Sequence, residues 1–267
     1  MTAAAAPPPN TNSLPITRME TKRRTNTRTP TRSRVTPMMT DPALYKLLAW
    51  SSPGYPTGAF SYSHGLEWAV EAGDVKNLQG LLDYVTAVLS RGGGWVDAVL
   101  FAHAWRFVTT AAVAETDALA ALAAAFRGSS ETALESRQQG GAFLDVTRKA
   151  WPHPALEAFA VRQARAGTPV AHCIAVAVAC AAHEIALAPA LHSYIHAVAA
   201  NLVSAGARLI PLGQTQAQIA VAQLAPVIAD IAERAPTTSL DDLGTAAPAI
   251  ELCSLRHETQ YTRLFRS

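Results

Sequence analysis

Apolar side chains recur at steps of three and four residues along most of the chain after residue 40. The clearest case lies between residues 77 and 91, where the apolar positions are Leu78, Leu81, Leu82, Val85, Val88 and Leu89. Such spacing gathers apolar side chains on one face of an α-helix. No stretch alternates with the two-residue period of a half-buried strand, and no repeat of roughly 20–50 residues is present. The sequence therefore predicts an all-α protein.

Capping and helix-breaking residues divide this pattern into about ten helices in a single domain. Asp41-Pro42 is typical of a helix start, because Asp accepts a hydrogen bond from a free backbone N–H and Pro needs no donor there. Gly92-Gly93-Gly94 and Pro211-Leu212-Gly213 are typical of breaks between helices. The expected helices cover residues 42–50, 61–72 (or from 63), 77–91, 96–110, 116–127, 131–150, 154–166, 169–187, 189–209 and 214–235. A loop is expected at 236–248, ahead of a C-terminal segment at 254–267.

The composition favours a helical protein that covers part of its surface with a partner or a second copy. Hydrophobic residues make up 49% of the 267 positions and charged residues only 16%, so polar surface is scarce. The most apolar run, CIAVAVACAA, covers only residues 173–182, whereas a membrane-spanning helix needs about 20 residues. We therefore expect this run to be a buried helix and expect no membrane contact.

Charge is unevenly distributed along the chain. Residues 1–40 contain seven Lys or Arg and one acidic residue, a net charge of +6, and the remaining residues contain 15 basic and 19 acidic residues, a net charge of −4. The first 40 residues lack periodic apolar positions, which predicts a disordered basic tail before a folded part at 41–267. Their composition also resembles an organelle transit peptide; the alternatives are a solvated tail or a true start at Met38 or Met39. The acidic folded part gives no electrostatic case for nucleic-acid binding.

Cys173, Cys180 and Cys253 are the three cysteines, and no C-x-x-C motif is present. An odd number of cysteines without such a motif fits a reducing compartment better than a disulfide framework. The sequence therefore predicts a cytoplasmic protein.

The stretch SSPGYPTGAFSYSHGLEWAV (51–70) contains hydroxyls, an imidazole and a carboxylate. Catalysis by Ser61 or Ser63 is disfavoured, because G-x-S-x-G is absent and neighbouring residues on a helix do not face one another. One serine is expected to cap the helix instead. The chain also lacks a phosphate-binding loop, G-x-x-x-x-G-K-[ST] or G-x-G-x-x-G after a strand. The chain is therefore not expected to be an enzyme.

A metal site is the main alternative from side-chain spacing. His192 and His196 lie four residues apart, on one face of a helix, and Cys180 and His183 are on the preceding helix. Imidazole and thiolate groups at such spacing could bind Zn²⁺ or Ni²⁺. Both helices are mostly apolar, however, which favours core cysteines and hydrogen-bonded histidines over metal ligands.

Two further stretches contain many polar and aromatic groups. NLVSAGARLIPLGQTQAQ (201–218) places Arg208 before a break and uncharged amides after it, which suits a polar interface or a plain kink. SLRHETQYTRLFRS (254–267) is rich in Arg and aromatic residues, the types that dominate binding hot spots. It is expected either to become ordered on docking or to be a frayed terminal helix.

Together these stretches resemble the urease accessory protein UreF family. The matching segments are LLAWSSPGYPTGAFSYSHGLEWAVEAG (47–73), ESRQQGGAFL (135–144), NLVSAGARLIPLGQTQAQ (201–218) and IELCSLRHETQYTRLFRS (250–267). The resemblance extends from about residue 44 to the last residue. It implies an all-helical, non-catalytic protein that forms a homodimer and binds UreD (also called UreH). In that family the pair recruits the nickel-carrying GTPase UreG to the urease apoprotein, so nickel would be handled by the complex and no cofactor is expected on this chain alone.

The resemblance also implies a set of partner-binding residues. Those expected to contact a partner are Tyr62, His64, Glu67, Arg208, Gln214, Thr215, Arg256, His257, Glu258, Tyr261, Arg263, Phe265 and Arg266. Ser61 and Gly65 are expected to shape the backbone. The alternative function is a metallochaperone that holds nickel itself through His192 and His196, and a metal-dependent hydrolase is a more distant one.

Some positions depart from the family pattern. Tyr55, Thr57 and Ala59 occupy loop positions where small aliphatic residues or Gly are usual in the family. Gly140-Gly141 lies inside an expected helix, and each Gly there weakens a helix by about 1 kcal/mol relative to Ala. The continuity of the helix over 131–150 is therefore in question.

Overall fold

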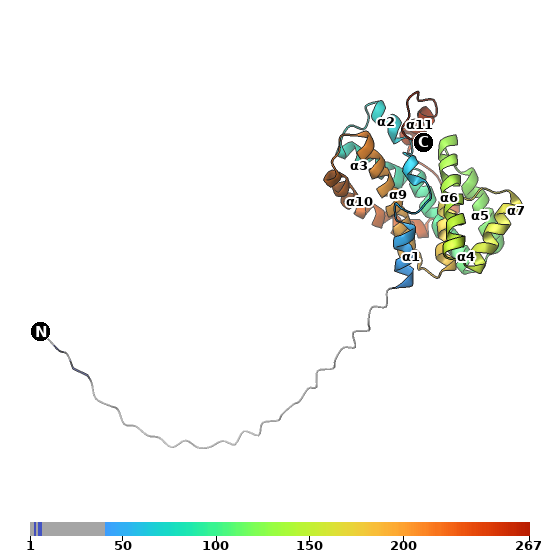
Figure 1. The fold of residues 1–267 in the computed structure, drawn as a ribbon, viewed down its shortest axis with the longest axis horizontal. Coiled ribbons are helices and arrows are strands. Elements are labelled where there is room, and N and C mark those ends of the chain that lie inside the picture. The colour runs from blue at the N-terminus through green and yellow to red at the C-terminus, as the bar shows by residue number, and fades with distance from the viewer. Residues whose placement is uncertain (1–2, 4, 7–40) are drawn as a thin grey trace, which may run out of the picture. The chain divides into compact units, whose positions relative to one another are not determined.

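The structure is a computed structural model that describes residue 3, residues 5–6 and residues 41–267. The expectation of a disordered basic tail at 1–40 therefore falls almost entirely outside the described residues. Residues 41–267 contain α-helices and short 3₁₀ turns and no strand (Figure 1). This confirms the all-α prediction for that part of the chain.

The first ten helices follow the expected order along the chain, and the eleventh, which begins at Pro248, was not among the expected helices. The helices are α1 (Pro42–Trp50), α2 (Leu66–Glu71), α3 (Leu78–Arg91), α4 (Gly93–Thr109), α5 (Val113–Ala125), α6 (Ser130–Ala150), α7 (Pro154–Ala166), α8 (His172–Ala182), α9 (Leu187–Leu209), α10 (Gln214–Arg234) and α11 (Pro248–His257). The expected loop at 236–248 contains the turns η2 (Ala235–Thr237) and η3 (Leu240–Asp242). A third turn, η1 (Ala59–Ser61), precedes α2.

Capping side chains begin several helices where the sequence predicts. The Asp41 side chain accepts a hydrogen bond from the N–H of Ala43, and Asn77 accepts one from Gly80 at the start of α3.

Helix α2 begins at Leu66, later than expected, because His64 and Gly65 both have a left-handed backbone, with φ of 56° and 78°. Two successive left-handed residues prevent a right-handed helix from continuing through them.

Helix α8 forms the centre of the core. Every residue from 173 to 182 is buried, and α8 packs against α4 and α6. This agrees with the buried helix expected from the apolar run. The helix ends earlier than the sequence suggests, because Glu184 adopts a left-handed backbone at φ 57° and the Ile185 N–H bonds back to Cys180. Among the described residues, no helix is long and apolar enough to cross a membrane.

Helix α6 continues without interruption through Gly140-Gly141. A Cβ atom at position 140 would lie only 2.0 Å from the carbonyl oxygen of Val170, whereas a Cβ at position 141 would meet nothing within 4 Å. Gly140 therefore lets the backbone before α8 approach α6 closely. This contact offsets the weak helix propensity of glycine, and the doubt about helix continuity is removed.

The end of the chain packs against its own beginning. Helix α11 contacts α2 and α6, and Figure 1 shows the C-terminus beside α2 and α11 at one end of the helical body. Gly65 permits this packing, because a Cβ there would lie 2.7 Å from the backbone nitrogen of Ser254 on α11. Segments that are far apart in the sequence, such as those joined by the hydrogen bond between Ser63 and Ser267, which are 204 residues apart, thus form one surface.

Candidate interaction site

Glu67, in the first turn of α2, binds the C-terminal segment through its carboxylate. Its Oε1 accepts the backbone N–H of Leu264 at 2.6 Å, and its Oε2 accepts the N–H of Phe265 at 2.9 Å and lies 3.0 Å from Nε2 of His257. Only 7% of Glu67 is exposed, so these hydrogen bonds replace its contacts with water. A carboxylate that accepts two backbone N–H groups fixes the position of the segment that it binds.

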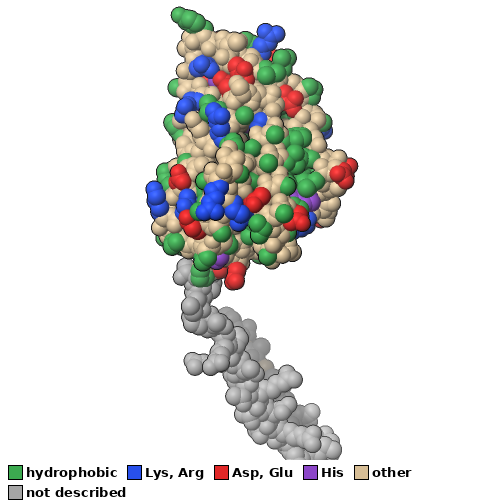
Figure 2. All heavy atoms as spheres, turned by 90° about the vertical axis from the view of Figure 1, so that its right-hand side faces the viewer, with side chains coloured by type: hydrophobic (Ala, Val, Ile, Leu, Met, Phe, Trp, Pro, Cys, Tyr) green, Lys and Arg blue, Asp and Glu red, His purple; other side chains and the backbone are tan. Residues whose placement is uncertain are grey.

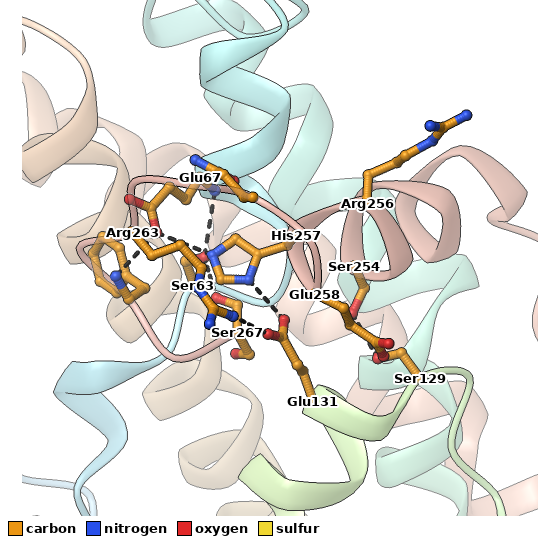
Figure 3. Close-up of polar contacts among 12 residues, drawn as sticks. Ser63, Glu67, Ser129, Glu131, Ser254, Arg256, His257, Glu258, Arg263 and Ser267 are labelled. Atoms are coloured by element: carbon orange, nitrogen blue, oxygen red, sulfur yellow. Dashed lines mark hydrogen bonds and ion pairs between the residues drawn. The ribbon is translucent and has the colours of Figure 1, made fainter.

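His257 lies at the end of α11 and is fully buried. Its Nδ1 is 2.6 Å from Oε2 of Glu131 on α6, on the opposite side of the ring from Glu67 (Figure 3). Glu131 also accepts a hydrogen bond from Nη1 of Arg263 at 2.7 Å. Two carboxylates, one imidazole and one guanidinium thus join α2, α6, α11 and the last residues of the chain.

The last two residues pair with the loop before α2. The Ser63 N–H donates to the Ser267 carbonyl oxygen at 2.9 Å, and the Arg266 N–H donates to the Ser61 carbonyl oxygen at 2.8 Å. Ser267 Oγ donates to Oε2 of Glu135 at 2.8 Å. The hydroxyl of Ser63 also donates to the carbonyl oxygen of Ser267 and so helps to hold the last residue against the loop.

Arg208 on α9 is stacked between two aromatic rings. Its guanidinium carbon is 3.7 Å from the ring centre of Phe60 and 4.3 Å from that of Phe265. Its Nη2 also donates to the carbonyl oxygen of Phe60 at 3.0 Å. A planar cation between two aromatic faces gains from both, and here it joins the loop, α9 and the C-terminal segment.

His64 lies where several cavities meet. Its Nδ1 is 3.6 Å from Oε2 of Glu135, and its side chain lines cavities of about 340 Å³ and about 230 Å³. Burial by itself lowers the pKa of His64, but the hydrogen bond and charge of Glu135, together with the charge of Asp97, raise the pKa above its ordinary value. Asp97 in turn forms an ion pair with Arg127 at 2.9 Å.

The residues expected to bind partners divide into an exposed and a buried group. The exposed ones are Gln214, Thr215, Arg256, Tyr261, Arg263 and Arg266, and His64, Arg208 and Glu258 are partly exposed. The buried ones are Tyr62, Glu67, His257 and Phe265. The buried group makes its contacts within the chain and supports the backbone from which the exposed group projects. The partly exposed Glu258 also makes a contact within the chain, since it accepts the N–H of Ser130 at the start of α6 at 2.9 Å.

Apolar side chains are also exposed on this surface. Leu252 and Leu255 project from α11, and Tyr261 and Leu264 project from the segment after it. On the face seen in Figure 2, Lys and Arg side chains are interspersed with Asp and Glu and with hydrophobic patches, without one continuous basic surface. Exposed apolar groups beside Arg residues are typical of protein-binding surfaces.

Glu131 and Glu135, two carboxylates of the site, were not among the residues expected to bind partners. Glu135 lies in the segment ESRQQGGAFL, and Glu131 lies just before it. Glu131 is 126 residues away from His257 in the sequence, so no local pattern links the two. The only feature of Glu131 that the sequence shows is its place in the first turn of α6. The helix dipole favours an acidic residue there whether or not the residue has a partner.

The side chains of the alternative metal site do not form one cluster. His192 and His196 are exposed and line a groove with α1, whereas Cys180 is buried in the core, where burial raises the pKa of its thiol. His183 faces the carbonyl oxygen of Trp151 at 3.1 Å. Within residues 41–267, no three His, Cys, Asp or Glu side chains are placed to hold a metal ion.

Comparison with known proteins gives one consistent result. The family model of UreF matches residues 75–225. A protein of Rhodopseudomonas palustris (strain BisB5), named urease accessory protein UreF, is 51% identical over 225 residues, which cover 84% of this chain and 91% of that protein. Proteins of the same name from Granulibacter bethesdensis and from a Bradyrhizobium strain are 50% and 49% identical; the matches cover 85% of this chain in both cases and 95% and 92% of those proteins.

Proposed function

Because this chain belongs to the urease accessory protein UreF family, we propose that it is a scaffold for urease maturation. Together with UreD (UreH), it recruits the nickel-carrying GTPase UreG to the urease apoprotein and helps to couple GTP hydrolysis to nickel insertion. The family is one of accessory proteins and not of enzymes. In this proposal the nickel ion is carried by the assembled complex, and this chain contributes surfaces.

The observation that carries the proposal is the surface formed by α2, α11 and residues 258–267. Its exposed side chains include the apolar Leu252, Leu255, Tyr261 and Leu264 and the basic Arg256, Arg263 and Arg266. The backbone beneath them is held by buried hydrogen bonds to Glu67 and Glu131. A rigid surface with apolar and Arg groups suits specific docking, since little conformational entropy is lost on binding. We assign this surface to UreD.

Helix α1 supports the homodimer that the proposal includes. It exposes Leu44, Tyr45 and Leu48, the last two with 63% and 65% of their surface accessible. Exposed apolar side chains at one- and three-residue steps on a single short helix are costly in water. A second copy of the chain would cover them in a two-fold symmetric contact.

A cytoplasmic location completes the proposal. The three cysteines, all of them within the described residues, are free thiols, which suits a reducing compartment. The alternative metallochaperone would need a further ligand beside His192 and His196. We therefore retain the scaffold as the proposed function.

Docking through this surface is tested by substitution of its exposed apolar residues. Full-length chain and a Tyr261→Asp/Leu264→Asp double variant are each mixed with the cognate UreD and analysed by size-exclusion chromatography with light scattering. We expect a 2:2 complex with the unchanged chain and a complex at least tenfold weaker with the double variant.

Val113→Asp is the matched control, because Val113 is an exposed apolar residue on α5, outside this surface. It should bind UreD as the unchanged chain does. If the unchanged chain forms no complex with UreD, the scaffold proposal is wrong. If the double variant binds as tightly as the control, the docking surface lies elsewhere.

A further inference from the structure

His192 and His196 are two exposed histidines on one face of α9. Side chains four residues apart on a helix have Cβ atoms roughly 5–6 Å apart, so both imidazoles can bind one metal ion at bond lengths of about 2.0–2.1 Å. The ring of His183 faces a backbone carbonyl oxygen and that of His257 lies between two carboxylates, whereas the rings of His192 and His196 make no hydrogen bond or ion pair with another described residue. Both exposed rings are therefore free to bind a ligand.

The two histidines line one side of a groove of about 700 Å³, and α1 lines the other side. Ser51, directly after α1, and Ser193, on α9, are joined by a hydrogen bond of 2.5 Å that holds the two helices against each other. Among the described residues that line the groove, none is Lys, Arg, Asp or Glu. A metal cation in the groove would therefore meet no fixed positive charge, and no carboxylate of the groove would pair with the imidazole rings.

One chain supplies only two ligands for such an ion. Protein sites for Zn²⁺ are tetrahedral, and structural sites take all four ligands from side chains. Within residues 41–267, no three His, Cys, Asp or Glu side chains are placed to hold a metal ion together. The ligands that complete the site must therefore come from solvent or from a second molecule.

The exposed side of α1 indicates that a second copy of the chain is this molecule. Leu44 and Leu48 are exposed on α1 and line the same groove as the two histidines. A two-fold symmetric contact places the same surface of both chains face to face. A contact that covers these leucines therefore also brings the histidine pairs of both chains to one interface, where four imidazoles complete a tetrahedral site.

We propose that His192 and His196 form half of a binding site for a divalent transition-metal ion, and that the same two residues of a second copy complete it. Imidazole suits both Zn²⁺ and Ni²⁺, so both ions belong to the chemical class that fits. The inference rests on the homodimer of the proposed function and goes beyond the scaffold role, because it gives this chain a metal site of its own. The bound ion cross-links the two copies and stabilises the dimer.

Metal binding is tested on the full-length chain after removal of metal with EDTA. Zn²⁺ and Ni²⁺ are titrated separately by isothermal titration calorimetry. We expect one ion per two chains, and binding about tenfold weaker or more in a His192→Gln/His196→Gln double variant. No binding of either metal, one ion per chain, or an unchanged affinity in the double variant would overturn the proposal.

His153→Gln/His183→Gln is the matched control. These two rings also lie close together, with their centres 5.2 Å apart, but they do not line the groove. The control should bind both metals as the unchanged chain does, and circular dichroism verifies that both double variants are folded. A loss of binding in the control alone would place the ion at His153 and His183 and would contradict the proposal.

Dimerisation provides a second measurement. An ion that binds only the dimer strengthens it by mass action, about 100-fold when the free ion is at about a hundred times its Kd. Light scattering over a dilution series with and without Zn²⁺ should show this shift in the unchanged chain and no shift in His192→Gln/His196→Gln. An equal shift in both proteins would mean that the metal acts elsewhere, against the proposal.

The same dilution series separates this inference from the proposed function. If the unchanged chain is a dimer whose dissociation constant does not change with metal, the metal site is wrong and the homodimer stands. If the chain is monomeric with and without metal, both the homodimer and the metal site are wrong, and binding to UreD still decides the scaffold role.

Discussion

The guanidinium of Arg208 on α9 lies 4.3 Å from the ring centre of Phe265, two residues before the last position of the chain. Phe60 covers its other face at 3.7 Å. Arg208 thus clamps the C-terminal segment and the loop before α2 onto one helix. No motif in the sequence links Arg208 to Phe60 or Phe265. The stacking of the guanidinium between the two rings therefore depends entirely on the fold.

Replacement of Arg208 by Lys should loosen this clamp although the positive charge is kept. A flexible ammonium group does not stack between two rings as a planar guanidinium does. We expect Arg208→Lys to lower the free energy of unfolding by about 1 kcal/mol, and Arg208→Gln by up to about 2 kcal/mol. Urea denaturation measures both values. Equal stability of the Lys variant and the unchanged chain would mean that charge alone, and not stacking, holds the segment.

Gly140 and Gly141 provide a pair of neighbouring substitutions with opposite expected effects. A Cβ at position 140 would collide with the backbone oxygen of Val170 at 2.0 Å, and one at position 141 would meet nothing within 4 Å. Gly140→Ala should therefore destabilise the protein by about 1–3 kcal/mol. Gly141→Ala should stabilise it by up to about 1 kcal/mol through helix propensity. Thermal unfolding followed by circular dichroism gives both changes, and a stabilising Gly140→Ala would contradict the close packing of α6.

Much of the fold follows from local sequence signals. The expected helix at 154–166 coincides with α7 (Pro154–Ala166), because Pro at the start and Gly167 after the end are strong local boundaries. Helix α2 differs at its start, since it begins at Leu66 and not at Ser61 or Ser63. Its delayed start depends on the left-handed backbone of His64 and Gly65, which lets α11 pack closely. Such a tertiary contact leaves no periodic pattern.

The candidate interaction site could be predicted from the sequence only in part. The stretches 51–70 and 254–267 are unusual in composition, and the structure brings them together. What composition does not reveal is which side chains face inward: Tyr62, Glu67 and His257 are buried, although all three were expected to contact a partner. Glu131 has no distinguishing signal because its partners are more than 100 residues away.

Acid should destabilise the protein through His172. Burial lowers the pKa of His172 to about 4, below the ordinary value of 6.5. Between these values the unfolded chain binds the proton and the folded chain does not, so stability falls as the pH decreases from about 6.5 to about 4. The full effect is on the order of 3 kcal/mol. His64, whose pKa is raised, acts in the opposite direction. Its contribution to the stability of the folded protein is present in acid and is lost as the pH rises through its folded-state pKa.

Urea denaturation between pH 7.5 and 4.5 measures this dependence. His172→Gln should flatten the decrease in unfolding free energy at acid pH, whereas His192→Gln, which changes an exposed residue, should leave it as it is. An unchanged slope in His172→Gln would show that His172 is not the group responsible. The comparison uses slopes and not absolute stabilities, because removing the ring also removes its packing against Phe143 and Tyr194.

Leu48 on α1 should determine self-association. Its side chain is 65% exposed beside the exposed Leu44 and Tyr45, so a second copy of the helix would bury all three. We expect the unchanged chain to have the mass of a dimer in light scattering at micromolar concentration. Leu48→Asp should weaken the dimer about 30-fold or more, because a carboxylate placed in an apolar contact loses its hydration without gaining a partner. Leu122→Asp is the control, since Leu122 is an exposed leucine on α5. A dimer that survives Leu48→Asp would place the interface away from α1, and a chain that is monomeric at all concentrations would refute the homodimer itself.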